Sequence, residues 1–160
     1  MPITVKNFAT LPHKEFLEML FDMSYSEIGK LIDDIIIFEA TIFEGTILAN
    51  LYESRQNPLD FNNRYSVFEW LLIMTNINNT LDTFDPNHFM YNLKYNNDHN
   101  IERDIKSRFD EHIDLFKKFH EYNVPGNGFI CDFFARLKTL KTLNPLLTTC
   151  IEELFAKISA

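Results

Sequence analysis

Apolar residues recur along most of this chain at intervals of three and four, which is the spacing of one face of an α-helix. Only Ile3 and Val5 alternate with polar residues as in a strand. Breaks in the pattern separate six predicted helices, over residues 12–23, 25–54, 62–81, 99–122, 129–140 and 145–158. We therefore predict an all-α, single-domain bundle over residues 1–160, with five to six helices and one long central helix.

The predicted boundaries carry recognisable end signals. Ser24 stands three residues before Glu27, and Ser66 three before Glu69, so each pair fits a capping box. Asn144 precedes Pro145, which suits the first turn of a helix. The helix over residues 25–54 would be about 45 Å long at 1.5 Å per residue, so we expect it to bend or project.

Composition favours a folded, intracellular protein. Hydrophobic residues make up 46% of the 160 positions and sixteen are Phe, which is enough apolar surface for one core. Cys131 and Cys150 are too few for a disulfide framework, so we interpret both as reduced. The start of the chain lacks the apolar segment of a signal peptide, and no apolar run approaches a membrane span. We expect a soluble, cytoplasmic protein.

Charge is distributed unevenly. The first 90 residues hold thirteen Asp and Glu against five Lys and Arg, whereas residues 91–160 hold ten of each. A pI near 5.0 argues against nucleic-acid binding through phosphates and against an anionic membrane surface. A one-sided acidic surface predicts a basic protein as partner.

The sequence contains no recognisable catalytic or metal-binding motif. It lacks Glu-x-x-His, Cys-x-x-Cys and Gly-x-Ser-x-Gly, and its four Gly allow no phosphate-binding loop, so we expect no cofactor, no metal and no enzyme activity. The one polar pair of interest is Glu39 with His112, each projected onto the apolar face of its helix. We interpret this pair as a buried structural contact, with catalysis as the less favoured alternative.

The opposite side of the helix over residues 25–54 brings acidic and aliphatic residues together. A projection at 100° per residue groups Asp33, Ile37, Glu44 and Leu48, with Asp34 nearby. These five residues are our predicted partner-binding site, because apolar anchors ringed by carboxylates are typical of protein interfaces. The alternatives are that Ile37 and Leu48 pack against another helix and that the carboxylates only face solvent.

The predicted function is inhibition of a basic protein by occlusion. In size and charge the chain resembles the small acidic immunity proteins that bacteria pair with toxic nucleases, which implies neutralisation of a toxin; no motif carries the resemblance. The alternative is a secretion chaperone or a viral or host-signalling adaptor that holds an amphipathic helix in an apolar groove. Binding that weakens steeply with salt would favour the inhibitor, and binding that survives salt would favour the groove.

Overall fold

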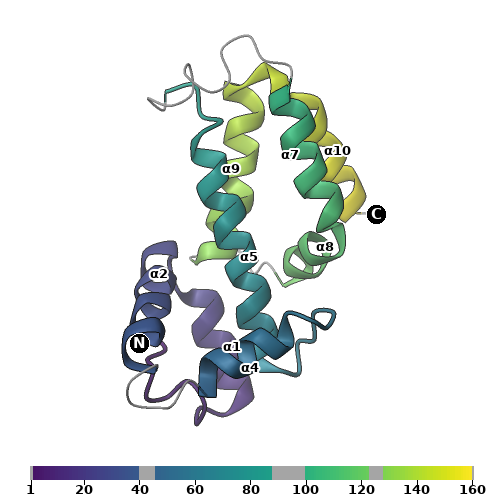
Figure 1. The fold of residues 1–160 in the computed structure, drawn as a ribbon. Coiled ribbons are helices and arrows are strands. Elements are labelled where there is room, and N and C mark those ends of the chain that lie inside the picture. The colour runs from purple at the N-terminus through teal and green to yellow at the C-terminus, as the bar shows by residue number, and fades with distance from the viewer. Residues whose placement is uncertain (1, 40–45, 88–99, 123–127, 160) are drawn as a thin grey trace. The chain divides into compact units, whose positions relative to one another are not determined.

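The computed structural model describes residues 2–39, 46–87, 100–122 and 128–159, apart from the side chains at 38, 39, 46 and 100–102. The elements are α1 (His13–Asp22), α2 (Tyr25–Asp34), η1 (Ile35–Glu39, a π-helix), α4 (Thr46–Ser54), α5 (Arg64–Asp82), α7 (Asn100–Glu111), α8 (Ile113–Glu121), α9 (Phe129–Leu143), η2 (Pro145–Leu147, a 3-10 helix) and α10 (Thr148–Ile158) (Figure 1). Within those ranges every regular element is helical. The all-α prediction is confirmed, and the predicted five to six helices become eight α-helices in the described ranges.

The chain divides into two compact units. Unit 1 comprises Met1–Met74 with Gly126–Phe129, and unit 2 comprises Thr75–Pro125 with Ile130–Ala160. Helix α5 contributes its residues up to Met74 to unit 1 and the remainder to unit 2. Whether the two units unfold together is a question of cooperativity, so the single-domain assignment stays a prediction.

The core of unit 1 is built around Phe8, which is fully buried. Its ring meets Phe16 of α1 and Phe68 of α5 edge to face, at centroid distances of 5.1 and 5.2 Å. Arg64, in the first turn of α5, lies 5.0 Å above the Phe16 ring and donates hydrogen bonds to the carbonyls of Phe8 and Leu11 at 2.8 and 2.5 Å. The N-terminal segment is thereby fixed to α1 and α5.

The predicted helix over residues 25–54 begins as expected but does not continue as one α-helix. Ser24 and Glu27 exchange the two hydrogen bonds of a capping box, each 3.1 Å long. After Asp34 the helix widens into η1, and α4 begins at Thr46. Three consecutive β-branched residues, Ile35 to Ile37, crowd an α-helical turn. A π-turn closes hydrogen bonds to the fifth residue rather than the fourth, so a projection at 100° per residue fails beyond it.

The second predicted capping box is wrong, because the two side chains are used elsewhere. Asn63 precedes α5, and its Oδ1 accepts from the backbone N–H groups of Tyr65 and Ser66 at 3.0 and 3.4 Å. The Ser66 hydroxyl instead accepts from the backbone N–H of Asp60 at 2.9 Å. Glu69 lies inside α5, where its side chain binds a neighbouring helix.

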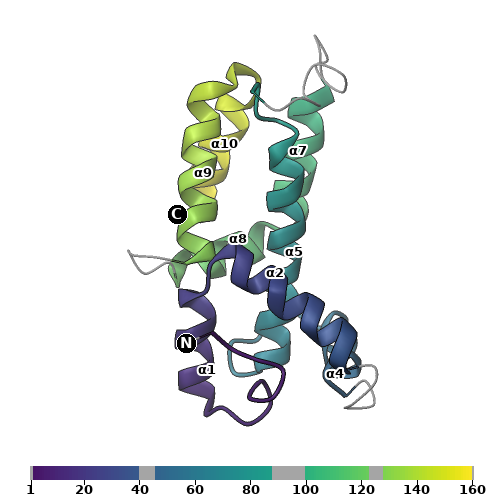
Figure 2. The same ribbon diagram turned by 90° about the vertical axis from the view of Figure 1, so that its left-hand side faces the viewer.

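Unit 2 contains a second interruption. The predicted helix over residues 99–122 is divided into α7 and α8 at His112, whose φ of −117° and ψ of 29° are not helical. The change of direction lets Phe116 meet Phe109 edge to face at 5.5 Å and stack on Phe133 of α9 at 5.7 Å. Helices α7 and α10 run side by side in both views (Figures 1 and 2). The apolar surface that α8 gains on α9 accounts for the break.

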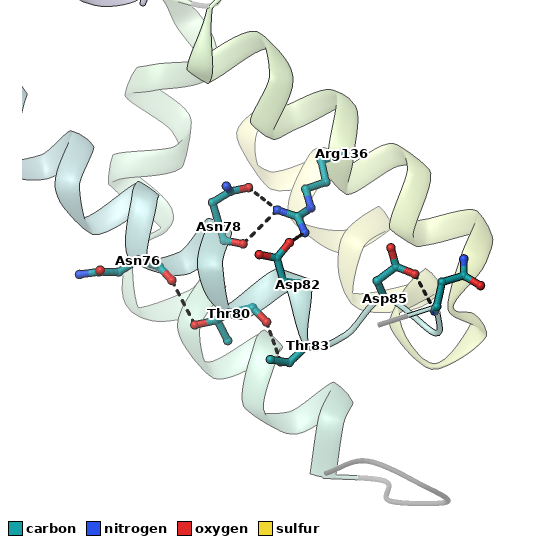
Figure 3. Close-up of polar contacts among 8 residues, drawn as sticks. Asn76, Asn78, Thr80, Asp82, Thr83, Asp85 and Arg136 are labelled. Carbon is teal, nitrogen blue, oxygen red and sulfur yellow. Dashed lines mark hydrogen bonds and ion pairs between the residues drawn. The ribbon is translucent and has the colours of Figure 1, made fainter. Parts of the chain in front are cut away.

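Ion pairs and hydrogen bonds connect the helices of unit 2. Lys157 of α10 binds Asp110 of α7 at 3.2 Å, alongside a 3.5 Å pair between Lys106 and Glu153. Arg136 of α9 reaches the last turns of α5, where it binds the Asp82 carboxylate and donates to Asn78 Oδ1 at 2.8 Å (Figure 3). Asn144 caps η2 as predicted, with its Oδ1 accepting from the Leu146 N–H at 3.1 Å.

Candidate functional site

Unit 1 contains an apolar groove of about 260 Å³ among α2, η1, α4 and the first half of α5. Its lining is mostly aliphatic and aromatic, with one charged pair, and comprises Ile32, Ile35, Ile36, Leu48, Leu51, Tyr52, Arg55, Phe68, Glu69 and Leu72. We call this feature the α4 groove.

Helical spacing explains how α4 and α5 each present a wall. Leu48, Leu51, Tyr52 and Arg55 lie at intervals of three, four and seven residues, so they share one face of α4. Seven residues at 1.5 Å per residue give the groove a length of about 10 Å along that helix. The groove is therefore about two helical turns long.

The edge of the α4 groove exposes large apolar side chains to solvent. Ile36 is 55% exposed and Tyr52 is 64% exposed, and both line the groove. Ile37, next along η1, is 61% exposed. In contrast, Ile35 is buried and forms part of the floor. Clustered exposed apolar residues of this kind usually mark an interaction surface.

A buried ion pair forms the polar end of the groove. Arg55 Nε donates to Glu69 Oε1 at 2.6 Å. The Glu69 side chain is 3% exposed, whereas that of Arg55 is 59% exposed. A carboxylate so deeply buried needs a charged partner, because desolvation strongly disfavours its ionised form. Arg55 supplies the charge and keeps most of its guanidinium at the surface.

The predicted partner-binding residues fall only partly on this groove. Leu48 lines it, and Ile37 is exposed beside it on η1. Asp33 is exposed and Asp34 half-buried in the last turn of α2, and neither forms an ion pair with any residue in the described ranges. Glu44 lies outside the described residues. The prediction that all five share one face of a continuous helix is wrong, because η1 intervenes.

The proposed Glu39–His112 contact is not tested, since the Glu39 side chain lies outside the described residues. His112 itself differs from the prediction, because it stands at the break between α7 and α8 rather than within an apolar helix face. Its Nε2 lies 4.0 Å from Glu111 Oε1 and its side chain is 23% exposed. His112 is therefore half-buried at a helix junction.

Sequence reasoning missed Ile36, Tyr52, Arg55 and Phe68. The spacing of Leu48, Tyr52 and Arg55 is visible in the sequence, but it identifies only a shared face. Which face of α4 remains uncovered depends on how η1 and α5 pack against it, and a single sequence does not contain that information.

A second hollow, in unit 2, has a different chemistry. Its volume is about 710 Å³, and its lining is largely polar: Asn79, Thr80, Thr83, Phe84, Asp104, Ser107, Arg108 and Glu111. These residues come from the end of α5, the segment after it, and α7. Phe84 is its one aromatic residue and is buried, so this hollow offers no exposed apolar anchor.

Other classes of site are not apparent in the described residues. No three His, Cys, Asp or Glu side chains in those ranges gather closely enough to hold a metal ion. Among the described helices, none combines the length and apolar composition that crossing a bilayer requires. Cys131 and Cys150 are both reduced thiols.

Comparison with known proteins gives no relative for this chain: no family model, curated protein or solved structure matches it.

Proposed function

We propose that this protein binds an amphipathic helical segment of another protein in the α4 groove. The observation that carries the proposal is the open groove itself, in which Ile36 and Tyr52 remain more than half exposed beside buried aliphatic walls. Leaving such side chains in water forgoes about 1 to 2 kcal/mol each, which a docked apolar partner would recover.

The dimensions of the groove suit a helix. A ligand helix places apolar side chains on one face at intervals of three and four residues, and about two turns match the 10 Å between Leu48 and Arg55. The walls are preformed by α4 and α5 and thus need no ordering when the partner binds. A short helix with two or three apolar anchors is the simplest occupant.

Charge favours a segment flanked by Lys or Arg. Unit 1 holds eleven acidic residues against five basic ones, whereas unit 2 holds twelve against ten. Asp33 and Asp34, on the helix that leads into the groove, stand without cationic partners in the described ranges. Such a field accelerates the approach of a basic partner, by 10-fold or more at low salt.

Inhibition of a basic, toxin-like protein by occlusion is the second candidate function. The acidic excess of unit 1 favours it, because a cationic substrate-binding surface could be covered by unit 1 as a whole. The two candidates differ in what carries the affinity: the groove in the first case, and carboxylates outside the groove in the second.

A displayed library of helical peptides tests the proposal even though the natural partner is unidentified. We expect selected peptides to share apolar residues at spacings of three or four with Lys or Arg outside them. Ile36→Glu should weaken their binding at least 100-fold, because it places a carboxylate among apolar anchors. Ile36 is more than half exposed, so the free energy of unfolding should change by less than about 0.5 kcal/mol.

Leu143→Glu is the matched control, since Leu143 is 43% exposed and lies in unit 2. It should leave the dissociation constant unchanged. Selected peptides that bind Ile36→Glu as tightly as the unaltered protein would contradict the groove proposal. If those peptides also lost affinity steeply with salt, the occlusion function would be favoured instead.

A further inference from the structure

We infer that Arg55 is the specificity determinant of the α4 groove and binds a carboxylate side chain of the docked segment. This inference rests on the proposed function and adds a chemical requirement to it. The partner helix would carry, besides its apolar anchors and basic flanks, one Asp or Glu positioned to meet Arg55.

The geometry of Arg55 leaves its outer nitrogens available. Only Nε is used in the pair with Glu69, at 2.6 Å. Nη1 and Nη2 make no hydrogen bond to any residue that the structure describes, and the side chain is 59% exposed at the polar end of the groove. Two adjacent N–H donors on a planar guanidinium fit the two oxygens of a carboxylate.

Arg55 also stands apart from the other cations of unit 1. Arg64 is engaged by the carbonyls of Phe8 and Leu11, and its guanidinium lies over Phe16. Lys6, Lys14 and Lys30 do not line the groove. Among the described residues, Arg55 is thus the one cation in the groove lining, within a unit whose net charge is strongly negative.

Glu69 gives the arrangement its rigidity. Because its carboxylate is nearly fully buried, it fixes the Arg55 side chain and reduces the conformational entropy that ligand binding would otherwise cost. A guanidinium held in this way resembles the supported polar groups that orient ligands in apolar sites. The apolar walls supply affinity, and Arg55 selects the register of the bound helix.

The spacing along α4 specifies where the carboxylate should occur. Arg55 lies three residues after Tyr52 and seven after Leu48, so a helix in the groove would place its carboxylate three, four or seven residues from an apolar anchor. An apolar residue at that position would leave the guanidinium partly desolvated without a partner, which disfavours competing ligands.

A double-mutant cycle on a selected peptide tests the inference. The cycle pairs the peptide and its Glu-to-Gln form with the protein and its R55Q/E69Q variant; replacing both protein residues avoids an unpaired buried Glu69. We expect the Gln peptide to bind the unaltered protein about tenfold more weakly, and both peptides to bind the R55Q/E69Q variant equally. Equal affinities of the two peptides for the unaltered protein would overturn the inference.

R55K provides a second measurement that keeps the ion pair with Glu69 and does not depend on the double variant folding. It should weaken the Glu peptide about threefold and leave the Gln peptide unchanged, since Lys has the charge without the fork. No change for either peptide would count against a bidentate contact. Selection with blocked, amidated peptide ends separates a side-chain carboxylate from a chain terminus, and loss of all binding on amidation would also overturn the inference.

Failure of this inference and failure of the proposed function can be told apart. Peptides that require Ile36 but ignore Arg55 would retain the groove and remove only its charge selectivity. Peptides that ignore both residues would remove the groove as a binding site.

Discussion

The two units use their carboxylates in opposite ways. In unit 2, Asp82, Asp110 and Glu153 each bind a cation on another helix, so charge holds the bundle together. In unit 1, Asp33 and Asp34 have no such partner among the described residues, and Glu69 is neutralised by Arg55. The comparison teaches that net charge alone does not identify a binding surface: what matters is the charge left over after the helices have been joined.

Exposed apolar side chains follow the same division. Ile36, Ile37 and Tyr52 are clustered on η1 and α4 beside one groove. Unit 2 exposes Tyr122 and Leu143 on separate elements, and its hollow has a polar lining. Uncompensated charge and uncovered apolar surface therefore coincide in unit 1.

The largest expected effect breaks unit 1 while leaving the groove residues unchanged. Gly128 has a φ of +124°, and a Cβ there would collide with the carbonyl oxygen of Phe21. Gly128→Ala should lower the free energy of unfolding by about 3 kcal/mol, through backbone strain and the clash. Chemical denaturation measures the loss, and hydrogen exchange should show it first in α1.

Gly29→Ala is the control, because Gly29 lies in α2 and a Cβ there meets no atom within 4 Å. It should raise the free energy of unfolding by about 0.5 to 1 kcal/mol through helix propensity. Equal hydrogen-exchange losses in α1 and α10 of the Gly128→Ala protein would indicate that the two units unfold as one.

A smaller effect is expected from removing the polar contact at the end of α5. Arg136→Met deletes the bonds to Asn78 and Asp82 and keeps the length of the side chain. Because Asp82 is half exposed, the loss in unfolding free energy should be about 1 to 2 kcal/mol. Thermal unfolding gives the stability, and peptide affinity for the α4 groove should be unchanged. A change in that affinity larger than the change in stability would show that unit 2 influences the groove.

The smallest effect concerns association rate. Asp33→Asn with Asp34→Asn should slow the binding of a basic peptide a few-fold at low salt and leave its dissociation rate nearly unchanged. Stopped-flow measurements at increasing ionic strength should bring the variant and the unaltered protein together. Asp104→Asn with Glu111→Asn, in the polar hollow of unit 2, removes the same charge and should have less effect. Equal slowing by both pairs would indicate that only the total charge matters.

Local sequence signals predicted much of the fold. The Ser24 capping box, the Asn144 cap and the apolar periodicity of α5 and α9 depend on neighbouring residues, so they could be read without tertiary information. The interruptions at η1 and His112 could not, because each is favoured by what the helix packs against on either side.

The candidate site was predictable only in part for the same reason. Leu48 and Ile37 were identified from helical projection, and both lie at or beside the groove. Arg55 and Glu69 were not, since their pairing joins α4 to α5 and depends on burial. Helical projection finds faces, but it does not show which face another helix covers.

The contribution of Gly126–Phe129 to unit 1 affects the order in which the protein can fold during synthesis. The Phe129 N–H donates to the Met23 carbonyl at 2.8 Å, and the Phe129 ring stacks on Tyr25 at 5.6 Å. A nascent chain that has left the ribosome only as far as Met74 lacks this closing contact. Excising the first 74 residues as a minimal binder would likewise omit it, so a stand-alone version should graft Gly128 and Phe129 back onto α1.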